Sequence, residues 1–184
     1  QRIGSIGDLV SFSFQANKNL STVEGGCLVL NNADEARLAE KLRLQGVTRT
    51  GMDGMDVDTL GGKDNLTDVN AVIGLHQLKH IGQFQGKRTA LAAHYFTALH
   101  FGLKAANLQG LDLGLPVQSD GDCKTNWHMF QVVLPLEQLT VDRAHIMTDL
   151  KELGIGTGVH YPAIPGFSLY QQKGYRPSDT PIAA

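Results

Sequence analysis

The chain has 184 residues, of which 42% are hydrophobic and 18% are charged, and its formal net charge is −2. This composition is typical of a globular protein that buries a core in one or two domains. The near-neutral charge provides no electrostatic footprint for nucleic acid or for an acidic membrane surface, and no run of eighteen apolar residues is present to span a bilayer.

Two short runs rich in Val, Leu and Phe, residues 8–14 and 26–31, predict strands near the start of the chain. Between them lies Lys18, among small, polar and aromatic residues and shortly before a Glu-Gly-Gly sequence. Lysine is most often a solvated surface residue. Between two buried strands, however, its amine would be partly desolvated, which favours the neutral form that attacks carbonyl carbons. Lys18 is therefore a candidate nucleophile.

A helix is predicted after the second strand. Asn32 stands three residues before Glu35, as in a capping box, and alanine and leucine side chains then recur on one face as far as Gly46. Residues 47–63 are polar and rich in glycine and aspartate, so we expect a loop without an element of its own.

Two more helices are predicted in the middle of the chain. Thr67 and Asp68 cap a segment whose apolar residues recur every three or four positions as far as Ile81. A third helical pattern covers residues 84–99, and the glycines between the two patterns, at positions 82 and 86, predict a break or kink.

The last third of the chain predicts a small α+β unit. Residues 127–134 and 155–161 have the composition of strands, and residues 142–153 predict a helix that Gly154 ends. The chain does not start with methionine, and residues 176–184 are loop-like. We therefore expect this sequence to be an internal piece of a longer protein.

Three segments of the chain resemble motifs of one family of enzymes. They are residues 11–26 around Lys18, residues 63–78, and residues 155–162 with the sequence Ile-Gly-Thr-Gly-Val-His-Tyr-Pro. Together and in this order they resemble the nucleotide-sugar aminotransferases, which depend on pyridoxal 5′-phosphate (PLP). Asn65 and the Gly-Thr-Gly-x-His pattern are most similar to enzymes that aminate the keto-pentose of UDP-4-amino-4-deoxy-L-arabinose synthesis.

The resemblance implies an α/β protein with the PLP-dependent transferase fold type I. Residues 1–83 would form the C-terminal part of the large PLP-binding domain. Residues 84–184 would form the small α+β domain, incomplete at its C-terminus. In this family the aspartate that partners the ring nitrogen of PLP precedes the lysine by more residues than this chain contains. We therefore expect the chain alone to be inactive.

The resemblance also assigns roles to four residues. Lys18 would bind PLP covalently and act as the catalytic base and acid, and Ser13, five residues earlier, would donate to the cofactor phosphate. Asn65 would reach the phosphate of the neighbouring subunit's cofactor, and His160 would contact the substrate. The residues by themselves leave other roles open: a strand serine for Ser13, a turn or cap for Asn65, and a structural hydrogen bond for His160.

The resemblance further implies transfer of an amino group, in this family usually from glutamate, to a nucleotide-linked keto sugar, by a homodimer with shared active sites. Cys27 and Cys123 lie far apart without a CxxC motif, which favours a reduced, cytoplasmic protein. The net charge of −2 and the absence of a long apolar run predict no nucleic-acid or membrane partner.

Two other functions compete with this interpretation. Dehydratases of the same family carry histidine in place of the cofactor lysine, and Lys18 argues against them. A non-catalytic regulatory protein of this fold, binding PLP or sugar without turnover, stays open. A metal site is not expected, because His76 and His80 have zinc-binding spacing but lack the glutamate of an HExxH motif and a third ligand.

Overall fold

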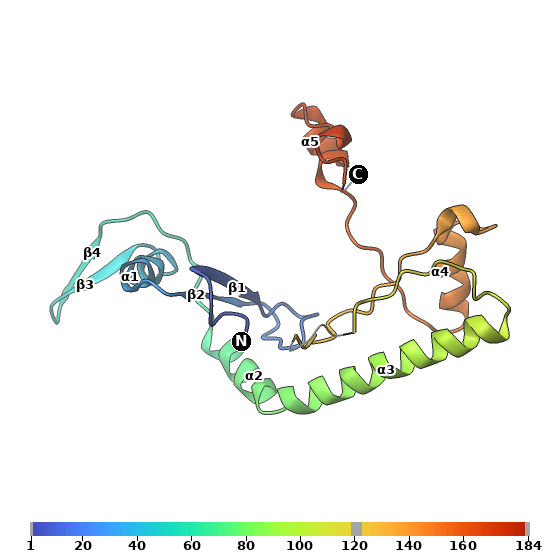
Figure 1. Cartoon of the computed structure of the whole chain (residues 1–184). Coiled ribbons are helices and arrows are strands. Elements are labelled where there is room, and N and C mark those ends of the chain that lie inside the picture. The colour runs from blue at the N-terminus through green and yellow to red at the C-terminus, as the bar shows by residue number, and fades with distance from the viewer. Residues whose placement is uncertain (1, 119–122, 183–184) are drawn as a thin grey trace. The chain divides into compact units, whose positions relative to one another are not determined.

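A computed structural model of the chain describes residues 2–118 and 123–182. The chain divides into two units, and Figure 1 labels the helices and strands of both. The first unit comprises Gln1–Gly110 and Leu115–Val132, and the second comprises Leu111–Gly114 and Val133–Ala184. The predicted division of the complete fold into domains at residues 83 and 84 stays a prediction.

The first unit begins with the two predicted strands, β1 (Leu9–Ser13) and β2 (Gly26–Leu30). They pair antiparallel, with Leu9 opposite Leu30 and Ser13 opposite Gly26. The loop that contains Lys18 connects the paired ends, so both of its ends are fixed by a strand.

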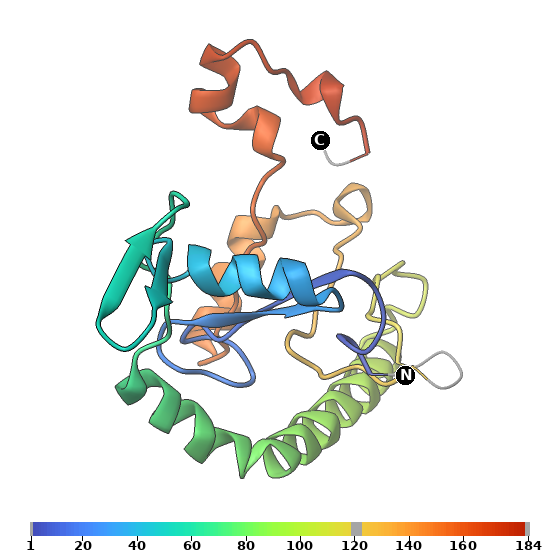
Figure 2. The same cartoon turned by 90° about the vertical axis from the view of Figure 1, so that its left-hand side faces the viewer.

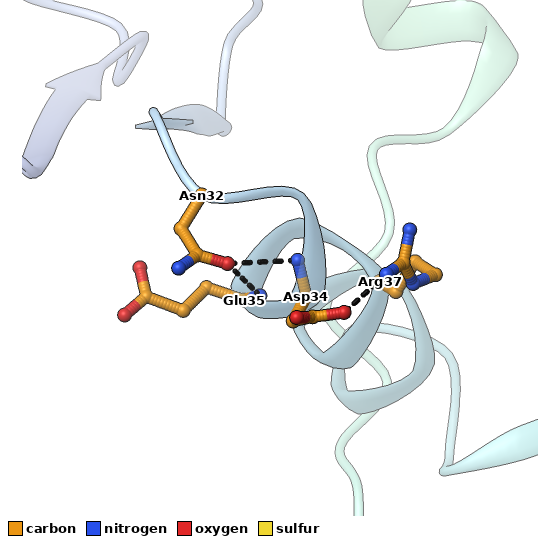
Figure 3. A network of polar contacts seen from close by, with 4 residues as sticks. All are labelled: Asn32, Asp34, Glu35 and Arg37. Atoms are coloured by element: carbon orange, nitrogen blue, oxygen red, sulfur yellow. Dashed lines mark hydrogen bonds and ion pairs between the residues drawn. The ribbon is translucent and has the colours of Figure 1, made fainter.

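Helix α1 (Ala33–Leu42) begins where the sequence predicted (Figure 3). The Asn32 side-chain oxygen accepts from the backbone N–H of Asp34 at 2.8 Å and of Glu35 at 3.2 Å. Two of the four donors left free at a helix N-terminus are thereby satisfied. The helix ends before Gly46, which has a φ of +73°. A Cβ there would lie 1.7 Å from the Thr59 carbonyl oxygen, so this close approach requires glycine.

The prediction of an irregular loop over residues 47–63 is wrong. Strands β3 (Val47–Thr50) and β4 (Gly54–Val57) form an antiparallel hairpin, in which Thr50 pairs with Gly54 (Figure 2). Some of the glycine and aspartate residues that suggested a loop lie in the three-residue turn and beyond the strands, but Gly54 and Asp56 lie within β4 itself. The strands themselves are four residues long and held by backbone hydrogen bonds, so they carry little alternation of apolar side chains.

Helices α2 (Asp68–Leu78) and α3 (Ile81–Ala105) follow one another, and the Thr67 hydroxyl caps α2 by accepting from the Asn70 N–H at 3.3 Å. The break between the helices lies at Lys79 and His80 rather than at the two glycines. Gly82 and Gly86 are inside α3, where no other part of the described chain approaches within 4 Å of a Cβ placed on either one. Glycine alone therefore does not break this helix.

The strand predicted over residues 127–134 does not form. Trp127 has a φ of +46°, which is incompatible with an extended strand. Its ring instead packs against Phe96 of α3 and against Phe130, at centroid distances of 5.8 and 6.3 Å. Within the described part of the chain, Val133 is the one residue of this segment that forms a bridge, with Gly114, and this bridge belongs to the second unit.

The second unit contains α4 (Arg143–Glu152), the helix predicted over residues 142–153, and the Asp142 carboxylate caps it by accepting from the His145 N–H at 2.8 Å. Gly154 follows the helix with a φ of +77°, as expected of a C-terminal stop. The strand predicted over residues 155–161 does not form, since the described chain supplies no paired strand for it. Short helical turns follow: η2 (Ile164–Gly166), α5 (Ser168–Gln172) and η3 (Pro177–Asp179). The turn η1 (Leu136–Gln138) precedes α4.

Few side chains are buried in either unit. Within the described residues, Ala92 of α3 is the only buried hydrophobic side chain, at 4% exposure. Four apolar residues of α2 are more than half exposed, namely Val69, Val72, Leu75 and Leu78, whereas Ile73 of the same helix is partly buried. This large apolar surface is available for packing against further protein. No helix in the described part of the chain is long and apolar enough to cross a membrane.

Candidate functional site

Lys18 lies half-buried in the loop between β1 and β2. The loop closes on itself where the Phe14 N–H donates to the Gly25 carbonyl and the Thr22 N–H donates to the Phe14 carbonyl, both at 2.8 Å. A turn forms inside it, with the Lys18 N–H donating to the Gln15 carbonyl at 2.9 Å. The lysine is thus held on a tightly closed loop.

Helix α2 fastens one side of this loop. The Ser21 N–H donates to the Gln77 side-chain oxygen at 3.0 Å, and the Asn70 side-chain amide donates to the Glu24 carbonyl at 2.9 Å. Thr22 is only 2% exposed. A Cβ on Gly74 would lie 2.7 Å from the Thr22 Cγ2 methyl carbon, so glycine at this helical position allows α2 to approach the loop.

The Glu-Gly-Gly sequence after the loop also has a steric reason. Gly25 has a φ of +156°, and a Cβ there would lie 2.4 Å from the Thr22 hydroxyl oxygen and 2.7 Å from Leu66 Cδ1. A Cβ on Gly26 would lie 2.7 Å from the Phe12 carbonyl oxygen. Val23 is in the left-handed region, at φ +71°, which is rare for a β-branched residue. The surrounding contacts hold this strained backbone in place.

Residues 125–128 fasten the loop from another side, through Asn19. Its side-chain amide nitrogen donates to the Asn126 carbonyl at 2.8 Å, and its oxygen lies 3.0 Å from His128 Nδ1. Arg88 of α3 in turn holds this segment, since its Nη1 donates to the carbonyls of Trp127 at 3.0 Å and His128 at 3.3 Å. Burial lowers the pKa of His128 below its ordinary value of 6.5, and the cations of Lys18 and Arg88 lower it further.

A shallow depression lies beside these contacts on the first unit. It is lined by Asn19, Phe84, Lys87, Arg88 and Leu91. Two of these residues are cations, so the depression offers positive charge to an anionic group.

Three of the four predicted site residues belong to the first unit. Ser13 is exposed at the end of β1, where its hydroxyl oxygen accepts from the Gln15 N–H at 3.4 Å. Asn65 is half-buried just before α2, next to Leu66, which contacts the lysine loop at Gly25. His160 is exposed in the second unit.

These residues fit a phosphate-bearing aldehyde cofactor. Within residues 2–118 and 123–182, the Lys18 amine forms no salt bridge, so no carboxylate competes for it. The hydroxyl of Ser13 adds a hydrogen-bond donor five residues away. The roles assigned to Ser13, Lys18, Asn65 and His160 stay predictions.

The sequence reasoning missed Asn19 and His128. Asn19 directly follows the lysine, which was the one available signal. Its partner stands 109 positions away in the sequence, and no motif spacing indicates that contact.

Comparisons with known proteins identify relatives along the whole chain. Residues 1–184 match the DegT/DnrJ/EryC1/StrS aminotransferase family. The spore coat polysaccharide biosynthesis protein SpsC of Bacillus subtilis is 35% identical over 194 residues, which cover 98% of this chain and 47% of SpsC. The uncharacterized protein MJ1066 of Methanocaldococcus jannaschii is 32% identical over 192 residues, which cover 100% of this chain and 47% of MJ1066. The chain spans about half the length of these relatives.

Solved structures of sugar aminotransferases are also similar to this chain. The PLP form of Spr1654 from Streptococcus pneumoniae, described as a sugar aminotransferase, matches with a TM-score of 0.79 and 28% identity, over 100% of this chain and 45% of Spr1654. The S. venezuelae protein DesV matches with a TM-score of 0.74 and 29% identity, over 94% of this chain and 42% of DesV. The predicted α/β fold, that of PLP-dependent transferases of fold type I, is confirmed.

Proposed function

Because the chain belongs to the DegT/DnrJ/EryC1/StrS aminotransferase family, we propose that the protein is a PLP-dependent aminotransferase that moves the amino group of glutamate to a nucleotide-linked keto sugar. The observation that carries this proposal is the position of Lys18. It lies on a closed loop fastened by α2 and by residues 125–128, with an amine that no carboxylate of the described chain engages.

In the proposed reaction, each of the four site residues has its own role. When bound, PLP supplies the electron sink for the transfer of the amino group. Lys18 holds the cofactor through its Nζ and, once free, moves the proton at the reacting carbon as base and then as acid. Ser13 donates from its hydroxyl to the phosphate, and Asn65 donates to the phosphate held by the neighbouring subunit. His160 contacts the sugar.

The reaction balances in two halves. Glutamate gives up its amino group and leaves as 2-oxoglutarate, and the sugar ketone takes up that group and leaves as an amine. The enzyme returns to its starting form, so ping-pong kinetics are expected. The cations Lys87 and Arg88, which line the depression, support a substrate with an anionic group, such as a nucleoside diphosphate.

We also propose that the enzyme is a cytoplasmic homodimer whose active sites are shared between subunits. An isologous two-fold contact creates two identical sites from one set of residues. The large exposed apolar surface of the first unit supports extensive packing against further protein.

The test is to add PLP to the full protein, reduce with borohydride and locate the modified lysine by mass spectrometry. The phosphopyridoxyl group is expected on Lys18. A label on Lys63 or Lys79 in place of Lys18 would contradict the assignment. Release of 2-oxoglutarate from glutamate that depends on the keto sugar then separates an enzyme from a protein that only binds the cofactor.

A further inference from the structure

The contact between Asn19 and residues 126–128 determines which way the Asn19 amide points. The group 2.8 Å from one end is the Asn126 carbonyl oxygen, which can only accept a hydrogen bond. The amide nitrogen must therefore face Asn126, and the amide oxygen faces His128 Nδ1 at 3.0 Å. The orientation follows from the network, because a flipped amide would place two acceptors together.

This orientation also determines where the proton of His128 lies. An amide oxygen can only accept, so Nδ1 of the imidazole must carry the proton and donate it to Asn19. In a neutral ring, Nε2 is then the unprotonated nitrogen. Asn19 thus selects one tautomer of His128, in the way that hydrogen-bond partners select the tautomers of other functional histidines.

The surroundings keep that ring neutral. Partial burial disfavours the imidazolium, and the cations of Lys18 and Arg88 repel it, so the pKa of His128 lies below its ordinary value. The backbone that carries the ring is held by Arg88, which donates to the carbonyls of both Trp127 and His128. Trp127 is held at φ +46°, a strained conformation for a bulky residue. Strain of this kind is commonly found where the backbone serves a function.

We propose that Asn19 and His128 form a clamp that positions Lys18, in which neutral His128 donates from Nδ1 to the Asn19 side chain. Asn19 and Lys18 are adjacent, so anchoring one Cα holds the other about 3.8 Å away. His128 acts through Asn19 and is a positioning residue rather than a proton-transfer group. The clamp's effect on cofactor binding rests on the proposed function, whereas its effect on the histidine tautomer does not.

The first experiment needs no cofactor. The ¹⁵N chemical shifts of the imidazole in the full protein distinguish the two neutral tautomers, and we expect the Nδ1–H form for His128. In Asn19→Ala the acceptor is gone, and the ring is expected to return to the Nε2–H form that free histidine prefers. The proposed clamp would be contradicted by an Nε2–H ring in the unsubstituted protein, or by an unchanged Nδ1–H ring in Asn19→Ala.

The second experiment uses two matched variants of His128. Asparagine places an amide N–H near the position of Nδ1, whereas glutamine places it near the position of Nε2. His128→Asn should therefore keep the donor to Asn19, and His128→Gln should lose it. The readout is the PLP concentration that gives half-maximal labelling of Lys18 after borohydride reduction. We expect it to rise about fivefold in His128→Gln, the value of one neutral hydrogen bond, and less than twofold in His128→Asn.

The outcomes are distinct. Equal labelling in all variants, or an equal loss in His128→Asn and His128→Gln, overturns the positioning role. If His128→Gln does not fold, Asn19→Ala removes the same contact while keeping the imidazole, and it must show the fivefold rise. Absence of any label on Lys18 in the unsubstituted protein would instead overturn the proposed function, and the tautomer measurement would still decide on the clamp.

Discussion

The contact between α2 and the lysine loop predicts an unusual effect of replacing Gly74 by alanine. In an exposed helix interior this change stabilises by about 1 kcal/mol, because glycine loses more backbone entropy than alanine. At Gly74, however, the new Cβ would lie 2.7 Å from the Thr22 methyl carbon, and Thr22 is 2% exposed. Overpacking of this kind costs about 1–3 kcal/mol. We therefore expect Gly74→Ala to lower the free energy of unfolding by about 1 kcal/mol.

Gly86→Ala is the matched control. It is also a glycine inside a helix, but nothing in the described chain lies within 4 Å of the new Cβ, so it should stabilise by about 1 kcal/mol. Denaturant unfolding of the full protein measures both changes. Thr22→Ser removes the methyl group and keeps the hydroxyl that donates to the Glu24 carbonyl at 2.8 Å. The double variant Gly74→Ala, Thr22→Ser should therefore have a free energy of unfolding about 2 kcal/mol higher than the sum of the two single effects predicts. Equal stabilities of Gly74→Ala and Gly86→Ala would refute the reasoning.

Three further predictions concern other parts of the first unit. Asn65→Ala should weaken PLP binding about tenfold, because a hydrogen bond to a charged group is worth about 1.5–3 kcal/mol. In a mixed dimer of one Asn65→Ala subunit and one Lys18→Ala subunit, one of the two sites should be active if the contact crosses the interface. If the contact lies within a subunit, neither site should be active. Asn32→Ala should destabilise the protein by about 1 kcal/mol in thermal or denaturant unfolding, because it removes the cap of α1, and an unchanged stability would contradict the role of the cap. Since the pKa of His128 is lower in the folded state, the unfolded state binds the proton first as the pH falls below about 6.5. The free energy of unfolding should therefore rise with pH up to about that value. This pH dependence should be weaker in His128→Gln, and an identical pH profile in the variant would contradict the prediction.

The local parts of this structure could be predicted from the sequence. Asn32 and Thr67 cap the helices that the sequence placed after them, and Asp142 caps the helix predicted over residues 142–153, because a cap joins a side chain to backbone donors only two or three residues away. The two strands around Lys18 were predicted for a similar reason, since their apolar composition and the intervening loop are visible in one short segment. The lysine itself was recognised from the residues next to it.

Contacts between distant residues decided the rest. The strands expected over residues 127–134 and 155–161 did not form, because an extended segment needs a partner whose identity local composition does not reveal. The hairpin at residues 47–57 was missed for the opposite reason, since its backbone pairing needs little apolar alternation. The need for glycine at position 74 arises only because α2 lies against the lysine loop. Likewise, the contact between Asn19 and His128 forms only because residues 125–128 lie against that loop. The sequence by itself determined which residue is the candidate nucleophile, whereas only the tertiary structure determined what holds it, because the hydrogen bonds that fasten the loop join positions between 46 and 109 residues apart in the chain.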